Sequence, residues 1–224
     1  MTSPTTTRDP SKFSDRRQAG RELAKRLSHY AGREDVLVLG LPRGGVPVGY
    51  EIANSLGAPL DVFIVRKLGV PGHEELAMGA IATGGIMVLD SALIRNLGLS
   101  SQGVQHVVEA EKRELERREK IFRAGRPALH VMGKTIILVD DGLATGATMR
   151  AAVKALKTQM PARMVIAVPV AAMETCESFR GEVDEVICAQ TPEHFYAVGL
   201  WYEDFSQTTD REVGELLTGA PSVK

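Results

Sequence analysis

Two adjacent carboxylates, Asp140 and Asp141, stand directly before a turn rich in glycine and threonine, residues 142–148. Residues 135–139 before them are apolar or β-branched, which predicts a buried strand. Behind the turn, apolar residues recur at i, i+3, i+4 and i+7 and predict a helix: Met149, Ala152, Val153 and Leu156. The N–H groups of the turn, its two hydroxyls and the positive end of the helix dipole favour a bound phosphate. The turn has neither the Gly-Lys-Ser/Thr ending of a P-loop nor the GxGxxG pattern of a dinucleotide site.

The two carboxylates call for a ligand that donates hydrogen bonds. An ionised carboxylate only accepts them, and the vicinal diol of a ribose offers two donors. Asp140 and Asp141 therefore suit a ribose diol, with a 5-phosphate held by residues 144–148. Their charge also suits a sugar that becomes cationic during reaction. The alternative is an ordinary strand–turn–helix in which one Asp caps the helix, which leaves the other residues unexplained.

The run Val-Asp-Asp-Gly-Leu-Ala-Thr-Gly-Ala-Thr, residues 139–148, resembles the signature of the type I phosphoribosyltransferases. These enzymes bind 5-phosphoribosyl-1-pyrophosphate (PRPP), and a ring nitrogen of a base displaces pyrophosphate from C1 through a sugar with oxocarbenium character. The resemblance implies Mg²⁺ that keeps several waters, with Asp140 and Asp141 as indirect ligands. It also implies that these residues bind the ribose and 5-phosphate: Asp140, Asp141, Gly142, Ala144, Thr145, Gly146, Ala147 and Thr148.

A second loop, residues 40–47, has the same order of elements: an apolar strand over 36–39 before it and a helix over about 48–56 after it. Arg43 is a forked cation suited to phosphate oxygens. Gly44 and Gly45 let backbone N–H groups approach a large anion. The alternative is a plain turn with a surface arginine. In the resemblance this is the pyrophosphate loop, formed by Arg43, Gly44 and Gly45, and the cis peptide that family members often hold there would fall at Pro42–Arg43.

A third loop is predicted over 66–75, after an apolar strand at 60–65. Its Pro and Gly residues predict mobility, and Arg66 and Lys67 place two cations at its root. In the family a comparable loop closes over the substrates, so Lys67, and after it Arg66, is the candidate contact to the departing pyrophosphate. The alternative is a solvated turn between strands.

The general base is not in its usual place. Hypoxanthine-guanine members carry an Asp before the Thr-Gly, where this chain has Ala144. The Leu-Ala-Thr-Gly wording is similar to adenine or uracil members, and residues 66–72 are similar to adenine ones. Another residue must then move the proton, and Glu74 is the first candidate, with Glu75 or His73 as substitutes.

Aromatic residues gather at 195–205, in a chain that is only 5% aromatic. Rings that stack and a carboxylate that accepts ring N–H donors suit a flat nucleobase. In the family such residues form a hood, which makes Trp201, Tyr202 and Asp204 the base-binding candidates. The alternative is that these aromatics are ordinary core residues.

Strands and helices alternate, which predicts an α/β fold: a doubly wound, mainly parallel sheet flanked by helices, with a small hood and a β-hairpin at 77–90 that has a two-glycine turn. The three loops would meet at the carboxyl ends of the strands. Further helices are expected at 13–30, 91–97 and 101–124, the last a solvated face or a dimer contact. The division expected is a mobile tail at 1–12, the main domain at 13–205, and a C-terminal helix and tail at 206–224.

The composition bounds the partners. The chain carries 27 Lys and Arg against 28 Asp and Glu, which disfavours nucleic acid and anionic membranes. Cys176 and Cys188 lack metal-site spacing, which indicates a reducing compartment rather than a disulfide. Without an apolar span or a signal segment, the expectation is a soluble cytoplasmic homodimer that binds PRPP and a base.

Two other functions fit the same motif. A regulatory protein would keep the fold and bind PRPP or a nucleotide without turnover. A different sugar-phosphate enzyme, a phosphorylase or hydrolase, would release ribose 5-phosphate without an added base.

Overall fold

Two of the candidate loops, residues 40–47 and 140–148, follow strands of a parallel sheet of five strands. The computed structural model describes residues 11–221, apart from the side chain of Glu75; most of the tail expected at 1–12 and the last three residues of the segment 206–224 lie outside it. The strands lie in the order β2-β1-β6-β7-β8 and all neighbours run parallel, which confirms the predicted fold class. Their bounds are β1 (Val36–Gly40), β2 (Leu60–Val62), β6 (Thr135–Val139), β7 (Arg163–Val170) and β8 (Glu185–Gln190).

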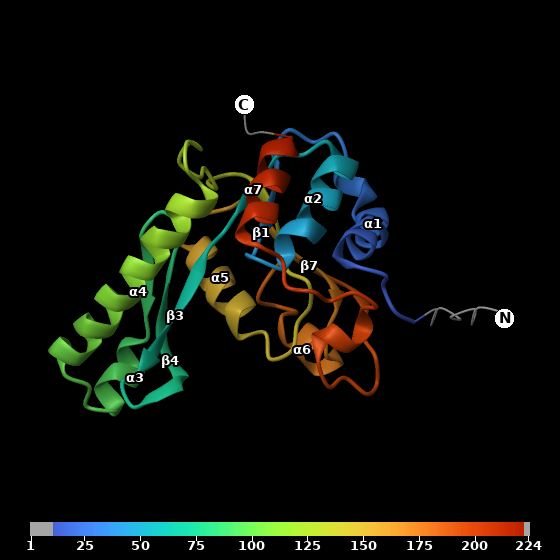
Figure 1. Cartoon of the computed structure of the whole chain (residues 1–224). Coiled ribbons are helices and arrows are strands. Elements are labelled where there is room, and N and C mark those ends of the chain that lie inside the picture. The colour runs from blue at the N-terminus through green and yellow to red at the C-terminus, as the bar shows by residue number, and fades with distance from the viewer. Residues whose placement is uncertain (1–10, 222–224) are drawn as a thin grey trace, which may run out of the picture.

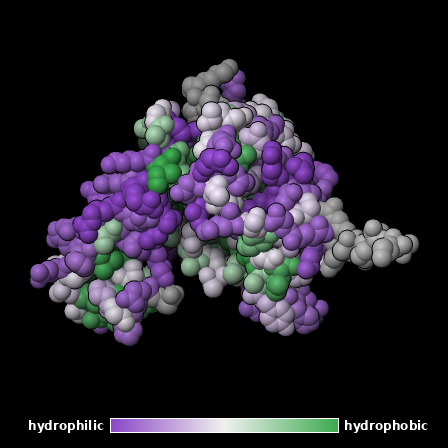
Figure 2. Space-filling view, in the orientation of Figure 1, coloured by the Kyte–Doolittle hydropathy of each residue, from purple (hydrophilic) through white to green (hydrophobic). Residues whose placement is uncertain are grey.

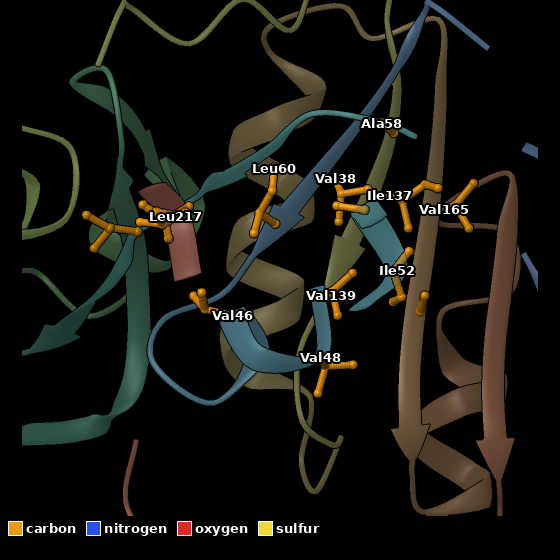
Figure 3. Packing of buried hydrophobic residues seen from close by; sticks show 14 of the residues in the cluster. Val38, Val46, Val48, Ile52, Ala58, Leu60, Ile137, Val139, Val165 and Leu217 are labelled. Atoms are coloured by element: carbon orange, nitrogen blue, oxygen red, sulfur yellow. The ribbon is translucent and has the colours of Figure 1, made fainter. Parts of the chain in front are cut away.

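Helices cover both faces of this sheet, as the fully apolar strands require. Because side chains alternate along a strand, Val38 and Ile137 face one layer, together with Ile52 of the helix α2 (Figure 3). Leu39 and Leu138 face the opposite layer. The first layer contains α1 (Arg16–Arg26), α2 (Gly45–Leu56) and α7 (Asp210–Gly219); the second contains α5 (Ala147–Lys157) and α6 (Met173–Ser178) (Figure 1). Burying each such Val or Leu side chain contributes about 1.5–3 kcal/mol.

The amino-terminal helix begins one residue after its cap. The Asp15 carboxylate accepts a hydrogen bond from Gln18 N at 2.7 Å, which satisfies one of the free donors of the first turn. Phe13, expected on the helix, lies before it instead. Its N–H donates to Trp201 O at 2.9 Å, and its carbonyl accepts from Glu203 N at 2.8 Å. The start of the described chain therefore pairs with the aromatic segment near its end.

The prediction of a loop over residues 66–75 is wrong. Residues 65–89 form an antiparallel sheet of three strands, β3 (Val65–Val70), β4 (His73–Ala82) and β5 (Ile86–Leu89), with a turn at Pro71–Gly72. Leu68 and Val70 are buried, and this period of two outweighs the loop signal of the intervening polar residues. The hairpin predicted at 77–90 is present, although its turn has three residues, 83–85, instead of two.

Two further helices cover the antiparallel sheet and make a lobe beside the central sheet (Figure 1). They are α3 (Ser91–Asn96), capped by Asp90, and α4 (Ser101–Phe122), capped by Ser100. In α4, Leu115 and Phe122 are buried in the same cluster as Leu68, while the rest of the helix is mostly polar. Figure 2 shows a recess between this lobe and the part that carries α6. Short 3₁₀ helices complete the fold at Ser28–Tyr30 and Val198–Trp201.

The two cysteines, expected to be reduced, are joined as a disulfide. Cys176 lies in α6 and Cys188 in β8, and packing of α6 on the sheet brings them together although 12 positions separate them. The sequence alone does not reveal the disulfide, because the distance between the two cysteines depends on where α6 packs on the sheet. No helix within residues 11–221 is both long and apolar enough to cross a bilayer.

Candidate functional site

The acidic pair, Asp140 and Asp141, lies where β6 ends. Oδ1 of Asp140 accepts a hydrogen bond from Asp141 N at 2.9 Å. Burial raises the pKa of the Asp140 carboxyl well above its usual value, and the neighbouring Asp141 charge raises it further. Burial also raises the pKa of Asp141, although a nearby cation opposes this. The site therefore keeps two acceptor groups in a largely desolvated position, where donors from a ligand are strongly favoured.

The cation is Arg16, which no sequence argument identified. Its Nε atom lies 2.7 Å from Oδ2 of Asp141, and both side chains are largely buried. Its guanidinium also stacks over the Phe205 ring at 3.9 Å and donates to Ser206 O at 2.7 Å. Only a polar residue at the start of an amphipathic helix was visible in the sequence. No local pattern links it to a carboxylate 125 positions away.

The glycines at 44 and 45 hold the loop 40–47 against the acidic pair. Leu41 N donates to Val139 O at 2.8 Å, and the Pro42–Arg43 peptide is cis, as the resemblance implies. A Cβ atom at Gly44 would overlap the Asp141 carboxylate, and one at Gly45 would lie 2.9 Å from Cα of Asp140. The two loops are thus in direct contact. The side chain of Arg43 points elsewhere, with Nη1 3.3 Å from Oδ1 of Asp210 in α7.

The turn 142–148 leads into α5 with its backbone donors exposed. Gly146, at φ 70°, is the N-cap residue and has no side chain to cap the helix, while Thr145 Oγ1 accepts a long hydrogen bond of 3.4 Å from Ala147 N. A bound anion can therefore use the free N–H groups of the first turn. The turn rests on α6, because Thr175 Oγ1 donates to Ala144 O at 2.7 Å. A Cβ atom at Gly146 would lie 2.9 Å from the side chains of Phe179 and Thr175, so glycine is required there.

Lys67 reaches the same region from the second sheet. It lines a cavity of about 650 Å³ between that sheet and α5, together with Thr145 and Ala147. This is a size typical of small-molecule sites. Arg66 points the other way, and its Nε atom lies 2.6 Å from Oε2 of Glu111 in α4. Glu74 lies in β4, exposed and outside the residues that line this cavity, as does His73.

The three base-binding candidates have different surroundings. Tyr202 is 4% exposed; its hydroxyl donates to Asp141 O at 2.7 Å and its ring packs on Phe13 and Phe205. Burial first, and then the Asp141 charge, raise its pKa, so it stays a neutral donor. Tyr202 is therefore a core residue, as the alternative expected, and its hydroxyl holds the backbone of Asp141. Asp204 is exposed, and its carboxylate accepts from Ser206 N at 2.8 Å.

Trp201 has an unsatisfied donor. Its Nε1 atom is buried and finds no hydrogen-bond partner among residues 11–221. A buried donor without a partner is uncommon and invites a ligand acceptor.

The acidic pair fits a magnesium ion held mainly by substrate. No three His, Cys, Asp or Glu side chains within the described chain converge as a ligand set. One oxygen of each aspartate is already engaged, by Asp141 N and by Arg16. The remaining oxygens suit contacts to the waters of a hydrated ion, which is the usual mode for Mg²⁺ beside phosphates.

Comparisons with known proteins agree with this geometry. Residues 13–203 match the family model of the phosphoribosyl transferase domain. A Mycobacterium tuberculosis protein provisionally named a phosphoribosyl transferase is 46% identical over 208 residues, which are 93% of this chain and 47% of that protein. The "Bifunctional protein PyrR" of a Roseiflexus species is 32% identical over 66% of this chain and 60% of its own length.

Among solved structures, TT1426 from Thermus thermophilus superposes with a TM-score of 0.83 at 42% identity. The match covers 92% of this chain and 97% of TT1426. The chain spans less than half the length of the M. tuberculosis protein it matches.

Proposed function

Because this chain belongs to the phosphoribosyl transferase domain family, we propose that it transfers the 5-phosphoribosyl group of PRPP to a nitrogenous base and releases pyrophosphate. One observation carries the proposal. The buried carboxylate pair Asp140 and Asp141 contacts the loop that carries Gly44 and Gly45. The pair is also followed directly by the turn at the amino end of α5, whose N-cap residue has no side chain. This matches the diol, 5-phosphate and diphosphate of a single ligand.

Each part has its own task. Asp140 and Asp141 accept the two hydroxyls of the ribose, and the N–H groups and hydroxyls of residues 144–148 hold the 5-phosphate. The backbone of Gly44 and Gly45 approaches the diphosphate. Charge on the acidic pair favours the oxocarbenium character that C1 acquires as the pyrophosphate leaves. Lys67, on the wall of the cavity that Thr145 and Ala147 also line, supplies positive charge to the departing pyrophosphate.

Asp140 and Asp141 would hold a hydrated Mg²⁺ through its waters, and the ion would supply positive charge beside the diphosphate.

The acceptor is proposed to be a nucleobase that meets Trp201. The indole N–H of Trp201 is the buried donor without a partner, and a ring nitrogen or carbonyl of a base would satisfy it. Ala144 stands where hypoxanthine-guanine members have a proton-accepting Asp, so those bases are disfavoured relative to adenine and uracil. We further propose a homodimer, which light scattering would measure directly.

The decisive experiment follows turnover. The protein is incubated with PRPP, Mg²⁺ and each base of a panel, and both pyrophosphate and nucleotide are quantified. Equal amounts of the two products with one base establish the activity. Ribose 5-phosphate without any base would instead indicate a hydrolase. The matched control is Asp140→Asn, which keeps the shape of the site and replaces one of its two carboxylates by a neutral amide.

A regulator that binds PRPP or a nucleotide without turnover is the second candidate. The observation in its favour is the Arg16–Asp141 ion pair, which occupies one of the two carboxylates in the ligand-free fold. Tight PRPP binding by calorimetry, with no pyrophosphate from any base and no effect of Lys67→Ala, would select the regulator over the enzyme.

A further inference from the structure

Three guanidinium groups meet at a cavity that borders the glycine loop 40–47 and is lined neither by the acidic pair nor by the turn 142–148. It has a volume of about 250 Å³ and lies between α4, α7 and the cis end of the glycine loop. Arg117 and Arg118 enter it from α4, Arg43 from the loop and Asp210 from the first residue of α7. Pro42 and Ile121 supply an apolar side. The surface along α4 is strongly hydrophilic in Figure 2.

The positive charge in this cavity exceeds the negative charge. Arg117 and Arg118 share one carboxylate, Glu114, with an Nε–oxygen distance of 2.7 Å in each pair. Among residues 11–221, Arg43 pairs with Asp210 by a single contact of 3.3 Å. Three cations are thus balanced by two acids. Hydrogen bonds and charge from Glu114, together with the charge of Asp210, raise the pKa of Arg117. Asp210 is therefore close enough to Arg117 to interact with it electrostatically.

The groups also remain available to a ligand. The side chains of Arg43, Arg117 and Arg118 are 37%, 57% and 32% exposed. Exposed ion pairs of this kind contribute little to folding, so stability does not account for three arginines at one point. Guanidinium forks match the oxygens of phosphate in pairs, which a lone ammonium does not.

We propose that Arg43, Arg117 and Arg118 form a binding site for a phosphoryl anion of two or more negative charges. The anion displaces Asp210 from Arg43 and draws Arg117 from Glu114. Ile121, 40% exposed at the side of the cavity, gives an organic substituent of the phosphate an apolar surface to lie on. Free phosphate, free diphosphate, a nucleotide and the diphosphate end of PRPP share this chemistry. The site does not depend on the proposed transferase activity.

The test reads the arginine side chains themselves. The full chain is labelled with ¹⁵N-arginine, and the Nε–H resonances of Arg43, Arg117 and Arg118, assigned by substitution, are followed by NMR. The titrants are inorganic phosphate, inorganic diphosphate, ATP, PRPP and, as an uncharged control, adenosine. Saturable shifts with a phosphoryl anion, and none with adenosine, are expected. Shifts from added diphosphate that persist with PRPP present identify a separate site; shifts that PRPP itself saturates identify its own diphosphate as the occupant.

Variants give the sign of the effect. Arg117→Ala and Arg118→Ala should each weaken binding about tenfold, the equivalent of one charge-assisted contact. Asp210→Asn should tighten it several-fold, because the competing carboxylate loses its charge; a purely structural role predicts no gain. Arg180→Ala is the matched control, since Arg180 makes an i,i+3 pair with Glu177 on an exposed surface, as Arg117 does with Glu114.

Two results would overturn the proposal. One is that no phosphoryl anion moves the Nε–H signals of Arg117 and Arg118. The other is that binding is unchanged in Arg117→Ala and in Asp210→Asn, with all variants folded by circular dichroism.

Discussion

Nε of Arg16 and Oδ2 of Asp141 lie 2.7 Å apart although 125 positions separate the two residues in the chain. Their side chains are only 12% and 16% exposed, so the pair is screened little by solvent. Each charge is thus tolerated because of the other. The amino-terminal helix is therefore part of the proposed sugar-binding site, since it carries the counter-ion of one of its two acids.

Arg16→Ala should destabilise the protein strongly. The change leaves the Asp141 carboxylate buried without its partner, at a cost of about 3 kcal/mol. Arg17→Ala is the matched control: Arg17 itself is 51% exposed, its partner Glu51 keeps Arg21 at 3.5 Å, and the loss should cost less than about 1 kcal/mol. Urea unfolding monitored by circular dichroism measures both. Equal effects of the two substitutions would mean that the Arg16–Asp141 pair is not buried in solution.

Gly44→Ala should lower PRPP affinity while Gly214→Ala does not. A methyl group at Gly44 overlaps the Asp141 carboxylate, so the loop or the carboxylate must move, at a cost of about 1–3 kcal/mol. A methyl group at Gly214 meets open space within α7, where alanine stabilises a helix by about 0.5–1 kcal/mol. Isothermal calorimetry with PRPP gives the affinities. Unchanged binding by Gly44→Ala would mean that the contact between Gly44 and Asp141 does not contribute to PRPP binding.

Asp140→Asn should stabilise the fold and abolish PRPP binding. Burial and the neighbouring charge raise the pKa of Asp140 in the folded state, so its ionised form costs stability as pH rises through that pKa. The neutral amide removes this cost, a gain on the order of 1 kcal/mol at pH 7. The gain should disappear near pH 4, where the carboxyl is largely protonated in the folded state. If Asp140→Asn is less stable than the parent at pH 7 in urea unfolding, the Asp140 carboxylate does not destabilise the fold.

Asp35 gives the opposite pH dependence. Hydrogen bonds from Arg33 and Thr135 lower its pKa to about 2. The group therefore adds stability above its ordinary pKa, and this is lost as pH falls from about 4 through 2. Because the side chain is 41% exposed, Asp35→Asn should cost less than about 1 kcal/mol at pH 6. The variant and the parent should converge at pH 2, and carboxyl-carbon NMR titration measures the pKa itself.

Reduction of the Cys176–Cys188 bond should lower stability. Closing a loop of this length restricts the unfolded chain by about 3 kcal/mol in the chain-entropy model. Unfolding with and without reductant gives the difference, and the Cys176→Ala/Cys188→Ala double variant should be insensitive to reductant. Intact mass after alkylation without reduction counts the free thiols; two free thiols in the purified protein would show the pair to be unbonded.

The elements that sequence analysis located correctly are those with one unmistakable period. The strand Thr135–Val139 and the helix after it have apolar residues that fit only one arrangement each, and the turn of the candidate phosphate site lies between them. The strand Val65–Val70 was missed because Arg66, Lys67 and Gly69 mask the buried Leu68 and Val70. Its burial depends on α4, a partner far along the chain.

The parts of the site that were missed depend on distant contacts. Arg16, which was not identified, and Tyr202, which was expected to bind the base, both reach Asp141, one by its guanidinium and one by its hydroxyl, and both are remote from it in sequence. A single sequence contains no signal for such pairs. The acidic pair and the turn were visible because their residues are contiguous, so that their chemistry can be inferred before their position is known.

Because the strands are parallel, the central sheet has polar residues at both of its edges, one formed by the amino ends of the strands and one by their carboxyl ends. Asp35, Thr135, Arg163 and Glu185 stand at the amino ends of β1, β6, β7 and β8, and Tyr30 bonds to two of them. The loops of the candidate site leave from the opposite ends of β1 and β6, roughly 13 Å away for a strand of five residues. An engineer can therefore redesign the amino-end network for heat tolerance while the chemistry at the far rim is left untouched.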